Sequence, residues 1–460
     1  MKPKQAMEYV VQDYNIQLSG KMISRALKAS REEVIGDKGA QNGKIRDYLM
    51  ELHRKNPGST TRLNVIPQPE SLPLFDRLYI SSDACKKGLI EGCRPLIGLD
   101  GCFLKGYYDG QLLSAVGQDG NNHFFVIAYA VVPNECKDTW KWFLTQLQHD
   151  LGDSTERGWN FISDQQKDIF PRAFHRNCVL HIWKNFIEQF KDQQTKQLVW
   201  DCARCTTEIE FKAAMEKLKQ ISVLAWEYLD RFDPATWSKA FFSPGPMVDN
   251  ITNNMCEVWN AKIVAYRGKP ILTMCEDLRC YLMRKMAAHK KKLEKHVGAL
   301  APVQQKRLDD FIKPKSHNWI AIWDGDSKRV LFEVHCMPCK HAVVAMSKMG
   351  LRPEDFVHKW LTMEVVRATY SHCIKPVNSE EYWVQSNAPN TLPPPIKRAA
   401  HRPKMKRRSD PVKKEMNPNK YRKTFQVTCL KCGQLGHYYK TCTNAPQRRR
   451  EGQRKGLCNL

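Results

Sequence analysis

Two aspartates lie in or directly after strand-like segments of this sequence, and together they could place two carboxylates in one cleft. Asp100 lies within the apolar run 95–104, and Asp164 follows the short run 159–163. Apolar runs of this length predict buried β-strands. Mg²⁺ prefers carboxylate oxygens, and two metals about 4 Å apart can bind both the attacking and the leaving oxygen of a phosphodiester. An aspartate after a strand more commonly caps a turn, so the metal interpretation needs a third acid.

The segment 253–265 supplies a candidate third acid. Helical spacing places Asn253, Glu257 and Asn260 along one polar stripe. We therefore take Glu257 as the third ligand. The three acids are expected to bind two Mg²⁺ or Mn²⁺ ions, which would activate water or a 3′-hydroxyl as the nucleophile.

The segments between the two aspartates predict a small sheet. The runs 111–118 and 123–132 have strand length, and the Asp-Gly-Asn-Asn at 119–122 is a hairpin signal. Apolar residues then recur at helical spacing from Trp140 to Leu151. A crossover helix of this kind favours parallel pairing of the next strand with a neighbour. If that strand returns beside the first one, the two aspartates face one cleft.

Six phrases of the sequence resemble, in this order, the catalytic domain of plant Mutator-like element (MULE) transposases. They are LDGCFLKG, QLLSAVGQDGNN, WKWFLTQL, ISDQQK, HRNCVLH and TNNMCEVWNAKI, and the resemblance covers most of residues 15–445. It implies a mixed α/β fold whose RNase H-like DDE core spans 90–300, with an all-helical insertion at about 182–245. The catalytic residues that it implies are Asp100, Asp164 and Glu257.

The family's C-x2-H signature is present after the second aspartate, as Cys178 and His181. A packed cysteine and a hydrogen-bonded histidine remain an equal interpretation. The family carries a full helix before this signature, whereas the segment here is shortened and contains Pro171. Because proline costs about 3 kcal/mol in a helix interior, we expect Asp164 to be less well supported than in the family.

Residues 1–67 predict helices over 4–13, 21–33 and 45–54. By the resemblance they correspond to the latter half of an N-terminal DNA-recognition region whose earlier half is missing. A helical support for the catalytic domain is the alternative.

Residues 317–345 resemble the family's SWIM zinc finger, which needs C-x-C, a spacer and C-x-H. Cys339 and His341 supply the second half, but no cysteine lies in 281–335 to supply the first. Four donors within seven residues would be cramped around a tetrahedral Zn²⁺. The substitute donors would be His335 and Cys336.

A stronger zinc motif lies in 429–442, where the spacing is C-x2-C-x4-H-x4-C and two glycines allow a tight turn. It resembles a retroviral-type zinc knuckle, which binds exposed bases of RNA or single-stranded DNA. The Zn²⁺ ligands would be Cys429, Cys432, His437 and Cys442. The nucleic-acid contacts would be Leu430, Tyr438, Arg448, Arg449 and Arg450.

Positive charge is concentrated at the end of the chain. The formal net charge is +25, and Lys397 to Leu460 carries 19 Lys or Arg against 3 Asp or Glu, a net +16. This favours nucleic acid over membrane as the partner. We expect a Pro-rich and then basic linker at 387–428 and a basic tail at 443–460, both largely disordered. A nuclear localisation signal or phosphate contact is expected from Arg402, Lys404, Lys406, Arg407 and Arg408.

Length and composition agree with a nuclear DNA-processing protein. A chain of 460 residues with 42% hydrophobic content predicts two to four domains and at least one core. Residues 1–30 lack the apolar core of a signal peptide, and no apolar run approaches the roughly 20 residues that span a bilayer. The 17 cysteines fit a reducing compartment with some of them bound to metal. The assembly state stays open, a homo-oligomer included.

Two functions remain in competition at this stage. One is metal-dependent DNA cleavage and strand transfer by the three acids. The other is a decayed or domesticated copy that binds nucleic acid and zinc without chemistry, for example as a transcriptional regulator.

Overall fold

The structure is a computed structural model. It describes residues 3–35, 39–106, 108–152, 158–164, 173–242, 248–318, 337–395 and 432. The chain divides into the compact unit Met1–Lys397 and a second unit, Arg398–Leu460. In the described part, the fold is mixed α/β. None of the helices in that part combines the length and the apolar character needed to cross a membrane.

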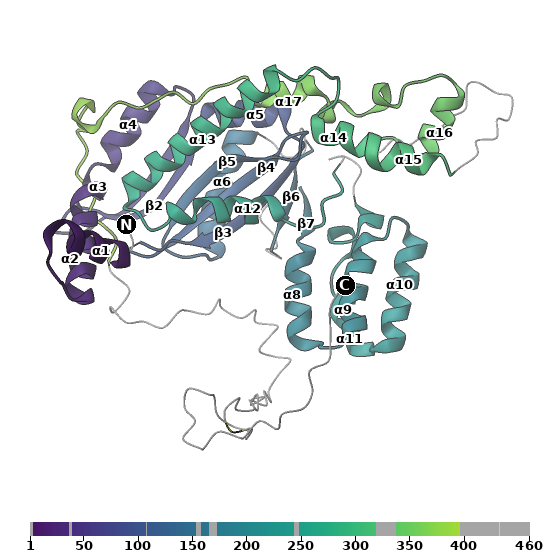
Figure 1. Ribbon diagram of the computed structural model, residues 1–460, viewed down its shortest axis with the longest axis horizontal. Coiled ribbons are helices and arrows are strands. Elements are labelled where there is room, and N and C mark those ends of the chain that lie inside the picture. The colour runs from purple at the N-terminus through teal and green to yellow at the C-terminus, as the bar shows by residue number, and fades with distance from the viewer. Residues whose placement is uncertain are drawn as a thin grey trace. The chain divides into compact units, whose positions relative to one another are not determined.

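The described residues form one mixed sheet of seven strands in the order β1-β2-β5-β4-β3-β6-β7 (Figure 1). The strands are β1 (Thr60–Ile66), β2 (Leu74–Ser81), β3 (Leu96–Phe103), β4 (Gln111–Gln118), β5 (Phe124–Val132), β6 (Asn160–Ser163) and β7 (Phe174–Asn177). Neighbours from β1 to β3 are antiparallel. β3, β6 and β7 run parallel to one another, so the sheet is antiparallel at its β1 end and parallel at its β7 end.

The predicted meander and the predicted parallel return are both confirmed. β3, β4 and β5 pair as consecutive antiparallel strands, and β6 pairs in parallel with β3. The hairpin at 119–122 holds Asn122 at a φ of 64°, a left-handed conformation that asparagine tolerates better than most residues. The helix predicted from Trp140 to Leu151 is α6 (Lys137–Leu151).

Three of the described strands, β1, β2 and β7, are not predicted by the sequence. The helices predicted over 4–13, 21–33 and 45–54 are confirmed, but β1 follows them within 1–67, so that segment is not helical throughout. β7 follows Asp164 in the segment expected to be a shortened helix. Its FHRN sequence has no apolar run, and Phe174 is 60% exposed, so pairing with β6 defines it as a strand. The strand that leads to Asp164 therefore has a hydrogen-bonded neighbour on each side.

Helices cover both faces of the sheet. α12 (Asn254–Lys262) packs so closely on β3 that a Cβ added at Gly98 would lie 2.3 Å from Asn253 Oδ1. On the other face, a Cβ added at Gly117 would lie 2.9 Å from Leu89 in α5 (Asp83–Gly92). Figure 1 shows α12 and the long α13 (Ile271–Glu294) on the near side of the sheet.

A second apolar core lies among four helices that follow β7. They are α8 (Val179–Gln189), α9 (Gln193–Arg204), α10 (Glu208–Ile221) and α11 (Val223–Asp230). Trp237 is fully buried in this core. Thr207 and Glu210 form reciprocal hydrogen bonds that cap α10.

The remaining helices precede β1 or follow α13. They are α1 (Pro3–Tyr14), α2 (Gly20–Ile35), α3 (Ala40–Gly43), α4 (Ile45–Lys55), α14 (Pro302–Arg307), α15 (Lys313–Ser316), α16 (Lys340–Lys348) and α17 (Met363–Thr369). The chain after α17 returns to the sheet, where Leu392 exchanges backbone hydrogen bonds with Pro73 and Phe75 beside β2.

Gly98→Ala should destabilise the protein by about 1–3 kcal/mol, because the new methyl group would overlap Asn253 and Cys256 and force α12 away from the sheet. Urea unfolding measures the change in free energy. Gly106→Ala is the matched control, since its nearest non-neighbouring atom would lie at an ordinary 3.7 Å. Equal stability of the two variants would contradict the close packing of α12 on β3.

Candidate active site

The parallel pairing of β3 and β6 places the two aspartates at equivalent points of adjacent strands. The register aligns Gly98 with Ile162, and Asp100 and Asp164 each follow two residues later. Adjacent strands lie about 4.8 Å apart. The two carboxylates therefore stand at the same edge of the sheet, as the sequence predicts.

Helix α12 is fixed to β3 by hydrogen bonds at both ends. Asn253 Nδ2 donates to the carbonyl of Leu99 at 2.9 Å, and Asn260 Nδ2 donates to Asp100 Oδ2 at 2.9 Å. In addition, Trp259 Nε1 donates to Ser114 Oγ of β4 at 2.9 Å. Asn253, Glu257 and Asn260 form one side of the helix. Glu257 is thus held on the side of α12 that faces the Asp100 strand.

Helix α8 connects the second aspartate with the glutamate. His181 Nδ1 lies 3.8 Å from Asp164 Oδ1, and Lys184 Nζ lies 3.6 Å from Glu257 Oε1. His181 and Lys184 are three residues apart and share one face of α8. The side chains of Asp164 and Glu257 are 19% and 34% exposed, so both carboxylates are accessible to solvent.

Cys178 connects the start of α8 to the start of α12 through a hydrogen bond. It is the residue before α8, its side chain is buried, and its Sγ accepts a hydrogen bond from the backbone N–H of Asn253 at 3.2 Å. Burial raises the pKa of the Cys178 thiol. The two residues of the C-x2-H signature therefore have different surroundings. The Cys178 side chain is buried against the start of α12, and His181 lies beside Asp164.

The carboxylates of Asp100, Asp164 and Glu257 suit a hard cation, but the three side chains do not converge on one point in this structure. Carboxylate oxygens are the ligands that Mg²⁺ and Mn²⁺ prefer. Among the described residues, no group of three or more His, Cys, Asp or Glu side chains is close enough to hold a metal ion. Asp100 accepts a hydrogen bond from Asn260, and Glu257 is paired with Lys184. A metal bound by all three acids would have to compete with these partners.

Sequence reasoning finds the three acids and Asn260 but misses Lys184. A lysine one turn after the signature histidine gives no distinctive signal in the sequence. Its place opposite Glu257 depends on how α8 and α12 pack, since 73 residues separate Lys184 from Glu257 in the sequence.

The predicted zinc ligands are only partly within the described residues. Cys339 and His341 lie at the start of α16, where Cys339 Sγ and His341 Nδ1 are 3.9 Å apart. Cys432 is described and its side chain is buried. The predicted sites that lie outside the described residues are His335, Cys336, Cys429, Leu430, His437, Tyr438, Cys442, Arg402, Lys404, Lys406, Arg407, Arg408, Arg448, Arg449 and Arg450.

The family model of the MULE transposase domain matches residues 96–185. This span begins with β3 and ends within α8, so it includes both aspartates and the C-x2-H signature, whereas Glu257 lies beyond it. The match supports the MULE family and suggests a function related to transposition, with DNA as the general partner. No curated protein matches the chain.

Cys178 should resist alkylation in the native protein, because its thiol is buried and its pKa is raised. Cys339 and Cys373 are exposed and should react faster than Cys178 with iodoacetamide. Peptide mass spectrometry after a timed reaction, with a urea-unfolded sample as the control, measures the labelling of each cysteine. Labelling of native Cys178 as fast as Cys373 would show that the thiol is accessible and reactive.

Proposed function

We propose that this chain is a MULE-type transposase-related protein that cleaves DNA and joins strands with the help of divalent metal ions. The observation that supports it best is the parallel β3–β6 pair, which brings Asp100 and Asp164 to one edge of the sheet. The match of residues 96–185 to the MULE transposase domain points to the same chemistry. On this proposal the sheet and α12 form an RNase H-like DDE core, and α8 to α11 are its helical insertion.

Asp100, Asp164 and Glu257 would hold the metal ions. Bound Mg²⁺ or Mn²⁺ supplies Lewis-acid activation of water or a 3′-hydroxyl and stabilises the leaving 3′-oxygen. The chain's own residues prepare the site. Asn260 orients Asp100, His181 lies beside Asp164, and Lys184 balances the charge of Glu257. The Lys184 side chain is 51% exposed, so its contact with Glu257 would not prevent that carboxylate from holding a metal ion.

A second candidate is a nucleic-acid-binding protein without chemistry. The ion pair of Glu257 with Lys184 favours this alternative, because it already gives the third acid a partner. Both candidates share the nuclear location, the basic tail and zinc binding at 429–442.

Wild-type protein should nick or cleave a labelled element-end duplex in Mg²⁺ or Mn²⁺. Asp164→Asn and Glu257→Gln should each lower the rate by about 10³-fold, because a metal contributes several kcal/mol of charge stabilisation. Gel electrophoresis of the product measures the rate. Glu216→Gln, an exposed acid on α10, is the matched control and should keep the wild-type rate.

The two candidate functions separate in the same assay. Wild-type protein that binds the duplex but cleaves no faster than Asp164→Asn and Glu257→Gln would leave only the binding function.

The purified full-length chain should contain about one Zn²⁺, held by the knuckle, because three thiolates and one imidazole complete a tetrahedral site. Cys442→Ser should reduce the zinc content to near zero, whereas Cys339→Ser should leave it unchanged. Elemental analysis of the dialysed protein measures the content. Loss of zinc in Cys339→Ser but not in Cys442→Ser would place the metal at the SWIM-like segment instead.

A further inference from the structure

A large cavity lies on the side of α12 opposite to Glu257. Its volume is about 920 Å³, and Asn254, Met255, Val258 and Lys262 line it from α12. These residues project away from the Asn253, Glu257 and Asn260 stripe, because each residue of an α-helix turns by about 100°. The cavity is therefore separate from the carboxylate cluster.

The lining of this cavity is strongly basic. Its charged residues, other than histidines, are Arg94, Lys239, Lys262, Arg284, Lys285, Arg307 and Asp249. They come from segments far apart in the sequence. Lys239 Nζ pairs with Asp249 at 2.8 Å. Burial opposes ionisation of Asp249, but the hydrogen bond and charge of Lys239, with the charge of Arg307, still lower its pKa. Among the described lining residues, the single acid is thus already paired, and the cavity keeps an excess of positive charge.

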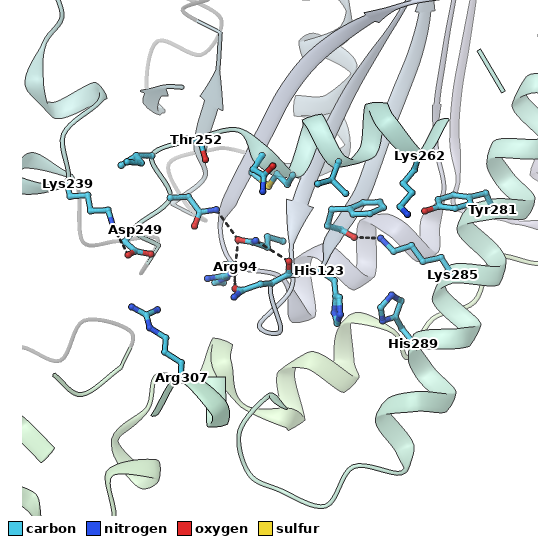
Figure 2. Close-up of a pocket in the computed structure, with 18 of the residues that line it drawn as sticks. Arg94, His123, Lys239, Asp249, Thr252, Lys262, Tyr281, Lys285, His289 and Arg307 are labelled. Atoms are coloured by element: carbon cyan, nitrogen blue, oxygen red, sulfur yellow. Dashed lines mark hydrogen bonds and ion pairs between the residues drawn. The ribbon is translucent and has the colours of Figure 1, made fainter. Parts of the chain in front are cut away.

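The basic groups lie at both ends of the cavity, with Arg94 between them. Figure 2 shows Lys239 and Arg307 at the end that includes Asp249, and Lys262 and Lys285 at the other. A single small anion would meet one of these groups. A chain with phosphates at regular intervals would meet several of them at once.

The floor of the cavity is a fixed polar network. Arg94 is 5% exposed, and its Nη2 donates to Gln118 Oε1 at 2.6 Å and to Asn122 Oδ1 at 2.7 Å. Asn250 Nδ2 donates to the same Gln118 oxygen at 3.1 Å. Ligand binding therefore needs little rearrangement of the floor, which reduces its entropic cost.

Lys285 makes one wall of the cavity receptive to an anion. Its ammonium lies over the Phe124 ring and donates to the Phe124 carbonyl. Burial lowers the pKa of Lys285 to about 7, so its charged form is poorly solvated in the free protein. A nearby phosphate would stabilise that charged form.

We propose that this cavity is a phosphate-binding groove, distinct from the carboxylate cluster, that holds the backbone of a DNA strand. The proposal rests on the proposed function only for the identity of the ligand as DNA. Since Glu257 and Lys262 lie on opposite sides of one short helix, a strand bound in the groove would set the position of α12 relative to the carboxylates.

Binding is tested with the full chain in EDTA, so that no cleavage occurs. Lys262→Gln/Arg284→Gln removes two exposed cations of the groove without disturbing a buried contact. Fluorescence polarisation with a labelled single strand should show about tenfold weaker binding and a salt dependence reduced by about 1.4 in slope. Lys137→Gln/Lys141→Gln removes two exposed charges from α6 and should behave as wild type.

Lysine footprinting separates the groove from the basic tail. Acetylation of Lys262, followed by mass spectrometry, should fall at least several-fold when the strand is bound, whereas Lys137 and Lys141 should stay unchanged. Pyrophosphate and a nucleoside triphosphate serve as competitors at equal phosphate concentration. At equal phosphate concentration, stronger protection of Lys262 by the strand than by either competitor supports the strand as the ligand. Stronger protection by a competitor would show that the groove does not bind a DNA strand.

Two results would overturn the groove itself: unchanged acetylation of Lys262 on strand binding, or equal affinity of the two double variants. The proposed cleavage activity fails independently. Absence of metal-dependent cleavage by the wild type, together with protection of Lys262, would remove the enzymatic function and leave the groove.

Discussion

The parallel pairing of β3 with β6 is the constraint on which the candidate site depends. It brings together two aspartates that are 64 residues apart in the sequence and directs both to one edge of the sheet. The pairing has a neighbour on each side, because β4 borders β3 and β7 borders β6. A strand pair inside a sheet has its backbone groups satisfied on both sides, so the positions of the two carboxylates are set by main-chain hydrogen bonds.

Helix α12 can reach these strands because β3 has a glycine at the point of contact. The absent side chain of Gly98 lets Asn253 approach closely enough to hydrogen-bond the Leu99 carbonyl. Cys178 then ties the beginning of α8 to the same asparagine. As a result, the positions of α8 and α12 are coupled, and α8 supplies the side chains that meet both Asp164 and Glu257.

The two sides of α12 have opposite electrostatic character. One side carries Glu257 toward the acidic strand ends, and the other contributes Lys262 to a cavity rich in Lys and Arg. The cations of the groove can attract a polyanion, and the carboxylates at the strand ends can coordinate a metal ion. Because α12 is only nine residues long, a ligand in the groove that moved the helix would also move Glu257.

The sequence by itself determined the meander, the crossover helix α6, the parallel return and the candidate acids, because apolar periodicity and turn residues act over short distances. It did not determine β7, whose polar residues become a strand only beside β6. Nor did it determine the Lys184–Glu257 pair or the basic groove. These depend on side chains from separate segments meeting in space, and no local pattern records which segments will pack together. The tertiary structure alone decided them.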